Sequence, residues 1–131
     1  MWVFVQKSGE LLLNDAHIGF GYSGAYGGGY NNPDMQEVHD EGPIPQGGWT
    51  IEGPPVDTPK HGPYVLRLTP KPKTDTFQRS GFLCHGDTVG NPGHASEGCI
   101  ILARFIRERI WNSGDRDLLV VAESPNASSS G

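Results

Sequence analysis

Apolar residues in most of the chain occur in short runs that Gly, Pro, Asn and Asp repeatedly interrupt. Runs of this length between turn residues are typical of β-strands. "WVFVQ" (2–6) and "LLLN" (11–14), joined by "KSGE", predict an N-terminal hairpin, and "HIGFGYSG" (17–24) alternates weakly after it. Further strands are expected at 49–52, 64–70, 81–86 and 117–123. The pattern therefore predicts a mostly antiparallel sheet or sandwich.

The spacing changes after Gly98. "CIILARFIRERIWNSG" (99–114) places apolar residues at helical intervals and ends on a helix-terminating Asn-Ser-Gly. We expect this helix to begin at or just after Cys99. The predicted fold is mainly β, sandwich- or barrel-like, with one principal α-helix after that cysteine. One domain is expected over 1–123, followed by a polar and disordered tail over 124–131.

Composition excludes several partners. The 131 residues include 19 Gly and 11 Pro, yet 35% are hydrophobic, which indicates a folded, loop-rich domain. The net charge of -5 and the scattered Lys and Arg disfavour nucleic acid and membrane surfaces. No run reaches transmembrane length, and no basic segment precedes the first apolar run as in a secretory signal. We expect synthesis in the cytoplasm, with export only by another route.

A glycine-rich segment, "AYGGGYNNPDMQ" (25–36), cannot form regular structure. It is either a surface loop or a loop that shapes a binding cleft. Tyrosines recur at four-residue intervals, at Tyr22, Tyr26 and Tyr30. Tyr30 is on this ground a candidate substrate contact.

The stretch "GFLCHGDTVGNPGHASEGCIIL" (81–102) contains both cysteines of the chain and two histidines. Cys84 and Cys99 could form a disulfide, although Cys84 is expected to face the core. His85, Asp87, His94 and Cys99 are capable metal ligands, but their spacing matches no tight zinc pattern. The third alternative is a thiol nucleophile with a histidine base, which needs neither metal nor cofactor.

The thiol mechanism assigns a role to several residues of this stretch. A cysteine attacks as its thiolate, and a helix N-terminus at Cys99 would lower the thiol pKa. Gly98 would let backbone N–H groups approach a substrate oxyanion. Ser96 either caps the helix, which is the commoner role, or orients a group in the site.

His85 is the better candidate for the base, because it is predicted on a rigid strand whereas His94 lies in a loop. His17, His39 and His61 are expected at the surface. The tautomer of His85 would be fixed by Asp87 or by a backbone carbonyl near Gly86, and we favour the carbonyl.

"HGD" followed by "ASEGCII" resembles the catalytic motif of YkuD-type L,D-transpeptidases. The resemblance implies that His85 is the base, Cys99 the nucleophile and Gly86 the source of an orienting carbonyl. Most of those enzymes carry His and Arg where this chain has Glu97 and Ile101. The substrate-holding role of that Arg would then pass to another arginine, for which Arg79 and Arg104 are the candidates.

Residues 19–102 together resemble the Tlde effectors of type VI secretion systems, through "GYSG", "NNPDMQ", "GPIPQGGWTI", "PPVDTPKHGPYVLRLTP" and "RSGFLCHGD…ASEGCIIL". The resemblance implies delivery by the secretion machinery into the periplasm of a rival bacterium, and a periplasmic immunity protein as partner. It implies an L,D-carboxypeptidase that removes the terminal D-Ala of peptidoglycan tetrapeptide stems and exchanges D-amino acids. The alternative is a non-catalytic wall-binding or interaction module with a structural Cys84–Cys99 disulfide.

Overall fold

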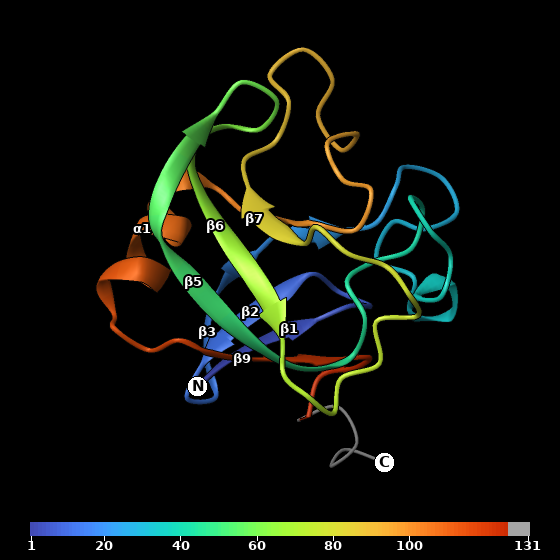
Figure 1. Cartoon of the computed structure of the whole chain (residues 1–131), viewed down its shortest axis with the longest axis horizontal. Helices are drawn as coiled ribbons and strands as arrows, with labels where there is room; N and C mark the ends of the chain where they lie inside the picture. The colour runs from blue at the N-terminus through green and yellow to red at the C-terminus, as the bar shows by residue number, and fades with distance from the viewer. Residues whose placement is uncertain (126–131) are drawn as a thin grey trace.

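The fold is seen in a computed structural model that describes residues 1–125 (Figure 1). It contains a short 3-10 helix, η1 (Pro33–Met35), and an α-helix, α1 (Arg104–Asn112). The strands of the described chain are β1 (Trp2–Val5), β2 (Glu10–Leu13), β3 (Ala16–Phe20), β4 (Tyr22–Ser23), β5 (Gly47–Thr58), β6 (Gly62–Pro70), β7 (Leu83–His85), β8 (Ile100–Ile101) and β9 (Asp117–Val121). The predicted N-terminal hairpin and the mainly β fold class are confirmed. The predicted tail lies almost wholly outside the described residues.

All these strands form one mixed sheet in the order β3-β2-β1-β9-β5-β6-β7-β8-β4. Two neighbouring pairs, β1 with β9 and β7 with β8, are parallel, and the other pairs are antiparallel. The long strands β5 and β6 cross the middle of the molecule, and α1 lies beside them (Figure 1). Strand β9 joins the N-terminal strands to the rest of the sheet.

The hydrophobic core forms on one face of the sheet, where α1 packs. Alternate residues of the strands point to this face, because neighbouring side chains in a strand point to opposite sides. Its largest fully buried side chains include Trp2, Phe4 and Trp49, and Ile106 and Ile110 of α1 are also buried. A smaller apolar cluster around Val3, Val5 and Leu12 lies apart from this core.

The helix begins later than predicted. Ile100 and Ile101 form β8, which pairs with β7 on one side and with β4 on the other, and α1 starts only at Arg104. A short apolar run fits a buried strand and a buried helix equally well by periodicity alone. Pairing with strands that are distant in the sequence decides between them, so the expectation of a helix beginning at Cys99 was wrong.

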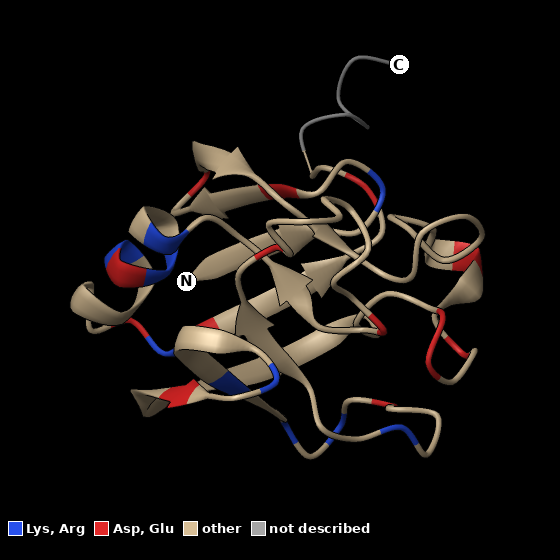
Figure 2. Ribbon diagram, turned by 90° about the horizontal axis from the view of Figure 1, so that it is seen from above, with Lys and Arg blue, Asp and Glu red and all other residues tan. Residues whose placement is uncertain are grey.

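Charged side chains are dispersed over the fold. Lys and Arg are interspersed with Asp and Glu, and α1 carries both signs (Figure 2). In the part of the chain that is described, no helix has the length and apolar character needed to cross a membrane.

Candidate active site

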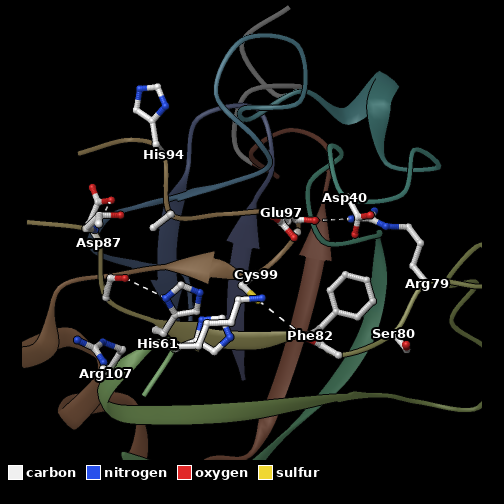
Figure 3. A pocket seen from close by; sticks show the side chains of 18 of the residues that line it. Asp40, His61, Arg79, Ser80, Phe82, Asp87, His94, Glu97, Cys99 and Arg107 are labelled. Carbon is white, nitrogen blue, oxygen red and sulfur yellow. Dashed lines mark hydrogen bonds between the residues drawn. The ribbon is translucent and has the colours of Figure 1, made fainter. Parts of the chain in front are cut away.

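The pairing of β7 with β8 brings His85 and Cys99 to the same side of the sheet. The two strands are parallel, with Cys84 opposite Ile100 and His85 opposite Ile101. Cys84 and Ile100 both belong to the core, so the adjacent His85 and Cys99 face away from it. Both line one pocket of about 830 Å³, in which Figure 3 shows the sulfur of Cys99 near the centre.

The ring of His85 is held by a backbone carbonyl. Its Nδ1 lies 2.9 Å from the carbonyl oxygen of Gly86. Because a carbonyl only accepts hydrogen bonds, Nδ1 carries the proton and Nε2 carries a lone pair. Among the described residues, this buried Nε2 has no hydrogen-bond partner. Burial is the main cause of a lowered pKa for His85, so the ring is a neutral base at physiological pH.

The thiol of Cys99 is neutral at rest. Its side chain is partly buried, and its Sγ donates a long hydrogen bond of 3.9 Å to the carbonyl oxygen of Gly81. Burial raises the pKa of Cys99, and a hydrogen bond from the Leu83 backbone opposes that rise. The expected lowering by a helix N-terminus was wrong, because α1 starts at Arg104 and a strand separates it from Cys99.

The two cysteines are not bonded to each other. Both thiols are free, and they lie on opposite sides of β7 and β8, with Cys84 in the core. Burial raises the pKa of Cys84 to about 12, as expected for a cysteine that packs as a small apolar side chain. The structure therefore contradicts the disulfide on which the alternative of a non-catalytic module depended.

Ser96 holds the backbone around the nucleophile. Its hydroxyl accepts hydrogen bonds from the N–H groups of Gly24, at 2.9 Å, and Gly98, at 3.1 Å. It donates one to the carbonyl oxygen of Cys99 at 2.7 Å. The side chain is 2% exposed. Ser96 does not cap a helix, because β8 lies between it and α1.

Position 98 requires glycine, both for its backbone conformation and for lack of space. Its φ of +139° lies in a region that residues with a side chain rarely adopt, and a Cβ here would collide with Nη2 of Arg79. Arg79 is 7% exposed and donates hydrogen bonds to the carbonyl oxygens of Gln36, Gly42, Pro43 and Glu97. Arg79 thereby connects the loop that contains residues 36–43 to the segment that carries Cys99.

Asp87 closes its own loop and does not contact His85. Its carboxylate accepts hydrogen bonds from Tyr22 Oη at 2.7 Å, from the Thr88 N–H and from the Gly93 N–H. Desolvation of the Tyr22 phenol and this bond to Asp87 both raise the pKa of Tyr22. The bond joins the 87–93 loop to β4.

The sequence model for the Tlde1 domain matches residues 18–122, which is most of the chain. This chain belongs to the Tlde1 domain family. Tlde1 domains are L,D-transpeptidase-like effectors of type VI secretion systems that target peptidoglycan. Comparisons with curated proteins and with solved structures gave no significant match.

The Tlde1 match starts within β3 and ends just after β9. It includes every residue predicted for the site, but not the hairpin formed by β1 and β2. Six of the predicted residues line the Cys99 pocket: Arg79, His85, Gly86, Asp87, Gly98 and Cys99. Ser96 does not line the pocket but hydrogen-bonds to Gly98 and Cys99, which do.

Two candidate substrate contacts of the Tlde1 domain lie elsewhere. Tyr30 stacks on Tyr22 and lines a separate hollow of about 420 Å³ with Tyr26, Gly27 and Gly93. Arg104 does not line the Cys99 pocket; it is exposed on α1, over the ring of Tyr64. Their places in the fold give no support to contact with a substrate at Cys99.

Several pocket residues were missed by sequence reasoning. The turn between β5 and β6 places Lys60 and His61 at the pocket, and the ring centroid of His61 lies 4.4 Å from that of His85. His39 and the buried Arg107 of α1 also line it. His39 is exposed, as expected, and His61 is half-buried, but the sequence did not indicate that both line the pocket of Cys99. "PKHG" reads as an ordinary turn, and only the length of the β5–β6 hairpin brings this turn over β7.

Proposed function

We propose that this Tlde1 domain is an L,D-carboxypeptidase and L,D-transpeptidase that acts through a Cys99 acyl-enzyme. Its substrate is the tetrapeptide stem of peptidoglycan, and the bond that breaks links the L-centre of the third residue to the terminal D-Ala. The observation that carries the proposal is the unpartnered Nε2 of His85 in the pocket of Cys99. The lone pair of this nitrogen is free to accept a proton, and the bond from Nδ1 to Gly86 fixes the ring.

The first step transfers the thiol proton as the new bond forms. His85 Nε2 takes the proton of Cys99 Sγ, and the sulfur attacks the carbonyl carbon of the L,D-amide. The tetrahedral intermediate then collapses, and Nε2 returns the proton to the departing nitrogen of D-Ala. A thioester and free D-Ala result, and the ring is again neutral.

The second step decides between hydrolysis and exchange. Water attacks the thioester carbonyl, with His85 as base, and releases a tripeptide stem. Alternatively, the amine of another D-amino acid attacks and forms a new L,D-amide. In both cases the sulfur leaves and recovers its proton, so one acyl-enzyme accounts for both activities.

The resting site supports proton transfer during attack. Burial raises the pKa of Cys99 and lowers that of His85, so the neutral pair is favoured over a thiolate–imidazolium pair. The thiolate therefore forms only when a substrate carbonyl is there to receive it. The Leu83 backbone lowers the pKa of Cys99 and so favours the negative charge that develops on sulfur.

The oxyanion is stabilised by the backbone at the nucleophile. The Gly98 N–H is already engaged by Ser96 Oγ at 3.1 Å. Among the hydrogen bonds of the described residues, the Cys99 N–H has no acceptor. We therefore assign the oxyanion to the Cys99 N–H, because an unengaged donor beside the reacting sulfur stabilises charge without rearrangement.

We infer the biological setting from the family. The domain would be delivered by a type VI system into the periplasm of a target cell, where trimming of tetrapeptide donors deprives the wall of cross-links. A periplasmic immunity protein would protect the producer.

The test is mass analysis of a disaccharide-tetrapeptide incubated with the protein, with and without an added D-amino acid. Wild type should release D-Ala and, with the added amino acid, yield the exchanged stem. Cys99→Ala should lose at least a thousand-fold in rate, as expected when a nucleophile is removed. Cys84→Ala is the matched control, because it removes the other thiol from the core and leaves the pocket intact. Equal activity of wild type and Cys99→Ala, or no release of D-Ala by folded wild type, would refute the proposal.

A further inference from the structure

Arg107 is a buried arginine with only part of its guanidinium engaged. It lies on α1 and is 4% exposed. Its Nε donates a hydrogen bond of 3.0 Å to the carbonyl oxygen of Leu102, and its Nη1 donates to those of Pro63, at 2.8 Å, and Tyr64, at 2.7 Å. Its Nη2 makes no hydrogen bond to any described residue, although the side chain lines the Cys99 pocket.

The free Nη2 lies beside Gly86. A Cβ placed on Gly86 would be 2.9 Å from it, closer than real Cβ contacts allow. The absence of a side chain at Gly86 therefore leaves room for Nη2 at the pocket wall. Gly86 directly follows His85, so Arg107 lies on the same side of the pocket as the base. Figure 3 shows Arg107 and Arg79 on opposite sides of Cys99.

The charge of Arg107 has no counter-ion in the described chain. None of the ion pairs among residues 1–125 includes it, and its hydrogen-bond partners there are all uncharged carbonyls. An arginine remains charged when buried, and a buried charge without a paired charge is costly. A carboxylate that enters the pocket would supply the missing partner.

The other two cationic side chains at the pocket are less suited to this role. Arg79 donates from both of its terminal nitrogens to backbone carbonyls. Lys60 is exposed at the tip of the β5–β6 turn and has no described partner that fixes its position. Arg107 alone combines a fixed position with an unoccupied donor.

We propose that Arg107 binds the terminal carboxylate of the stem peptide, an inference that rests on the proposed function. His85 gives its proton to the amine of the departing D-Ala, and the carboxylate of this residue is attached to the same Cα as that amine. A group that binds the carboxylate must therefore lie beside His85, where Nη2 is found. The incoming D-amino acid of the exchange reaction carries the same carboxylate and is bound in the same way.

This assignment makes the enzyme selective for free chain ends. A tetrapeptide with a free D-Ala carboxylate forms a charge-assisted hydrogen bond to Arg107. A stem whose D-Ala is amide-linked offers only a neutral carbonyl there. The difference between a charged and a neutral acceptor predicts a preference of about ten- to a hundred-fold in kcat/KM for the free acid.

The experiment compares a tetrapeptide that ends in D-Ala with the same peptide that ends in D-Ala amide. Release of D-Ala or of D-Ala amide is measured for wild type, Arg107→Lys and Arg107→Gln. Arg107→Lys keeps a positive charge for the neighbouring carbonyls but has a single nitrogen and so lacks Nη2. Both variants should lose the preference for the acid, chiefly through slower turnover of the acid. Arg104→Gln, on the exposed side of the same helix, should keep both the rate and the preference.

The outcomes distinguish failure of the carboxylate site at Arg107 from failure of the proposed function. If wild type cleaves the acid and the amide equally well, Arg107 is not the carboxylate site and the proposed function stands. The same holds if a folded Arg107 variant keeps the preference, or loses activity toward both peptides in equal proportion, as a purely structural arginine would. If wild type cleaves neither peptide, the proposed function fails and this inference fails with it. The wild-type comparison needs no variant to fold.

Discussion

Ser96→Ala should destabilise the protein far more than the loss of one hydroxyl from a surface would. The hydroxyl is buried, and its removal leaves the N–H groups of Gly24 and Gly98 and the carbonyl of Cys99 without their partner. An unsatisfied buried group costs about 1–3 kcal/mol, and neighbouring losses are not additive, so we expect the free energy of unfolding to fall by about 3 kcal/mol.

Thermal and urea unfolding measure this effect. For a domain of this size, a loss of about 3 kcal/mol corresponds to a decrease in Tm of roughly 10 °C. Ser80→Ala is the matched control, because Ser80 is exposed at the rim of the same pocket, and its change should stay within about 0.5 kcal/mol. If Ser96→Ala unfolds at the same urea concentration as Ser80→Ala, the hydroxyl does not hold the Cys99 segment as argued.

Three further predictions concern the same site. Gly98→Ala should lower the free energy of unfolding by about 1–3 kcal/mol in urea, because alanine is strained at φ +139° and meets Arg79; an unchanged midpoint would contradict this. Iodoacetamide should modify Cys99 in the native protein, faster as the pH rises above 9.0, the ordinary thiol pKa, and should reach Cys84 only after unfolding; mass analysis of native and unfolded protein checks both. The free energy of unfolding should decline as the pH falls below 6.5, the ordinary pKa of histidine, because the pKa values of His61 and His85 are lowered in the fold and the unfolded chain binds more protons there. It should also decline as the pH rises above 9.0, the ordinary pKa of a cysteine thiol, because the cysteine pKa values are raised in the fold; a flat curve from about pH 5 to 10 would refute this account.

The strands were predictable because apolar runs and turn residues are local signals. The first hairpin and β9 were placed to within two residues, and the opposite orientations of Cys84 and His85 follow from strand alternation alone. The motif residues at positions 85 and 99 are likewise readable from the sequence.

The start of α1 and the burial of Arg107 were not predictable in the same way. Ile100 and Ile101 form a strand only because β7 and β4 lie on either side of them, and both partners are distant in the sequence. In "RFIRER" every arginine reads as part of a solvated face, yet Arg107 turns inward and Arg104 outward. The carbonyls of β6 that receive Arg107 are set by packing that no local pattern records.

The position of β9 has a consequence for synthesis. This strand lies between β1 and β5, although among the strands of the sheet the ribosome makes it last. Until it emerges, β1 and β5 lack the strand that lies between them, and the sheet is interrupted there. The complete sheet therefore forms only after translation has passed residue 121, and a nascent chain arrested before residue 117 lacks the neighbour that β1 and β5 share.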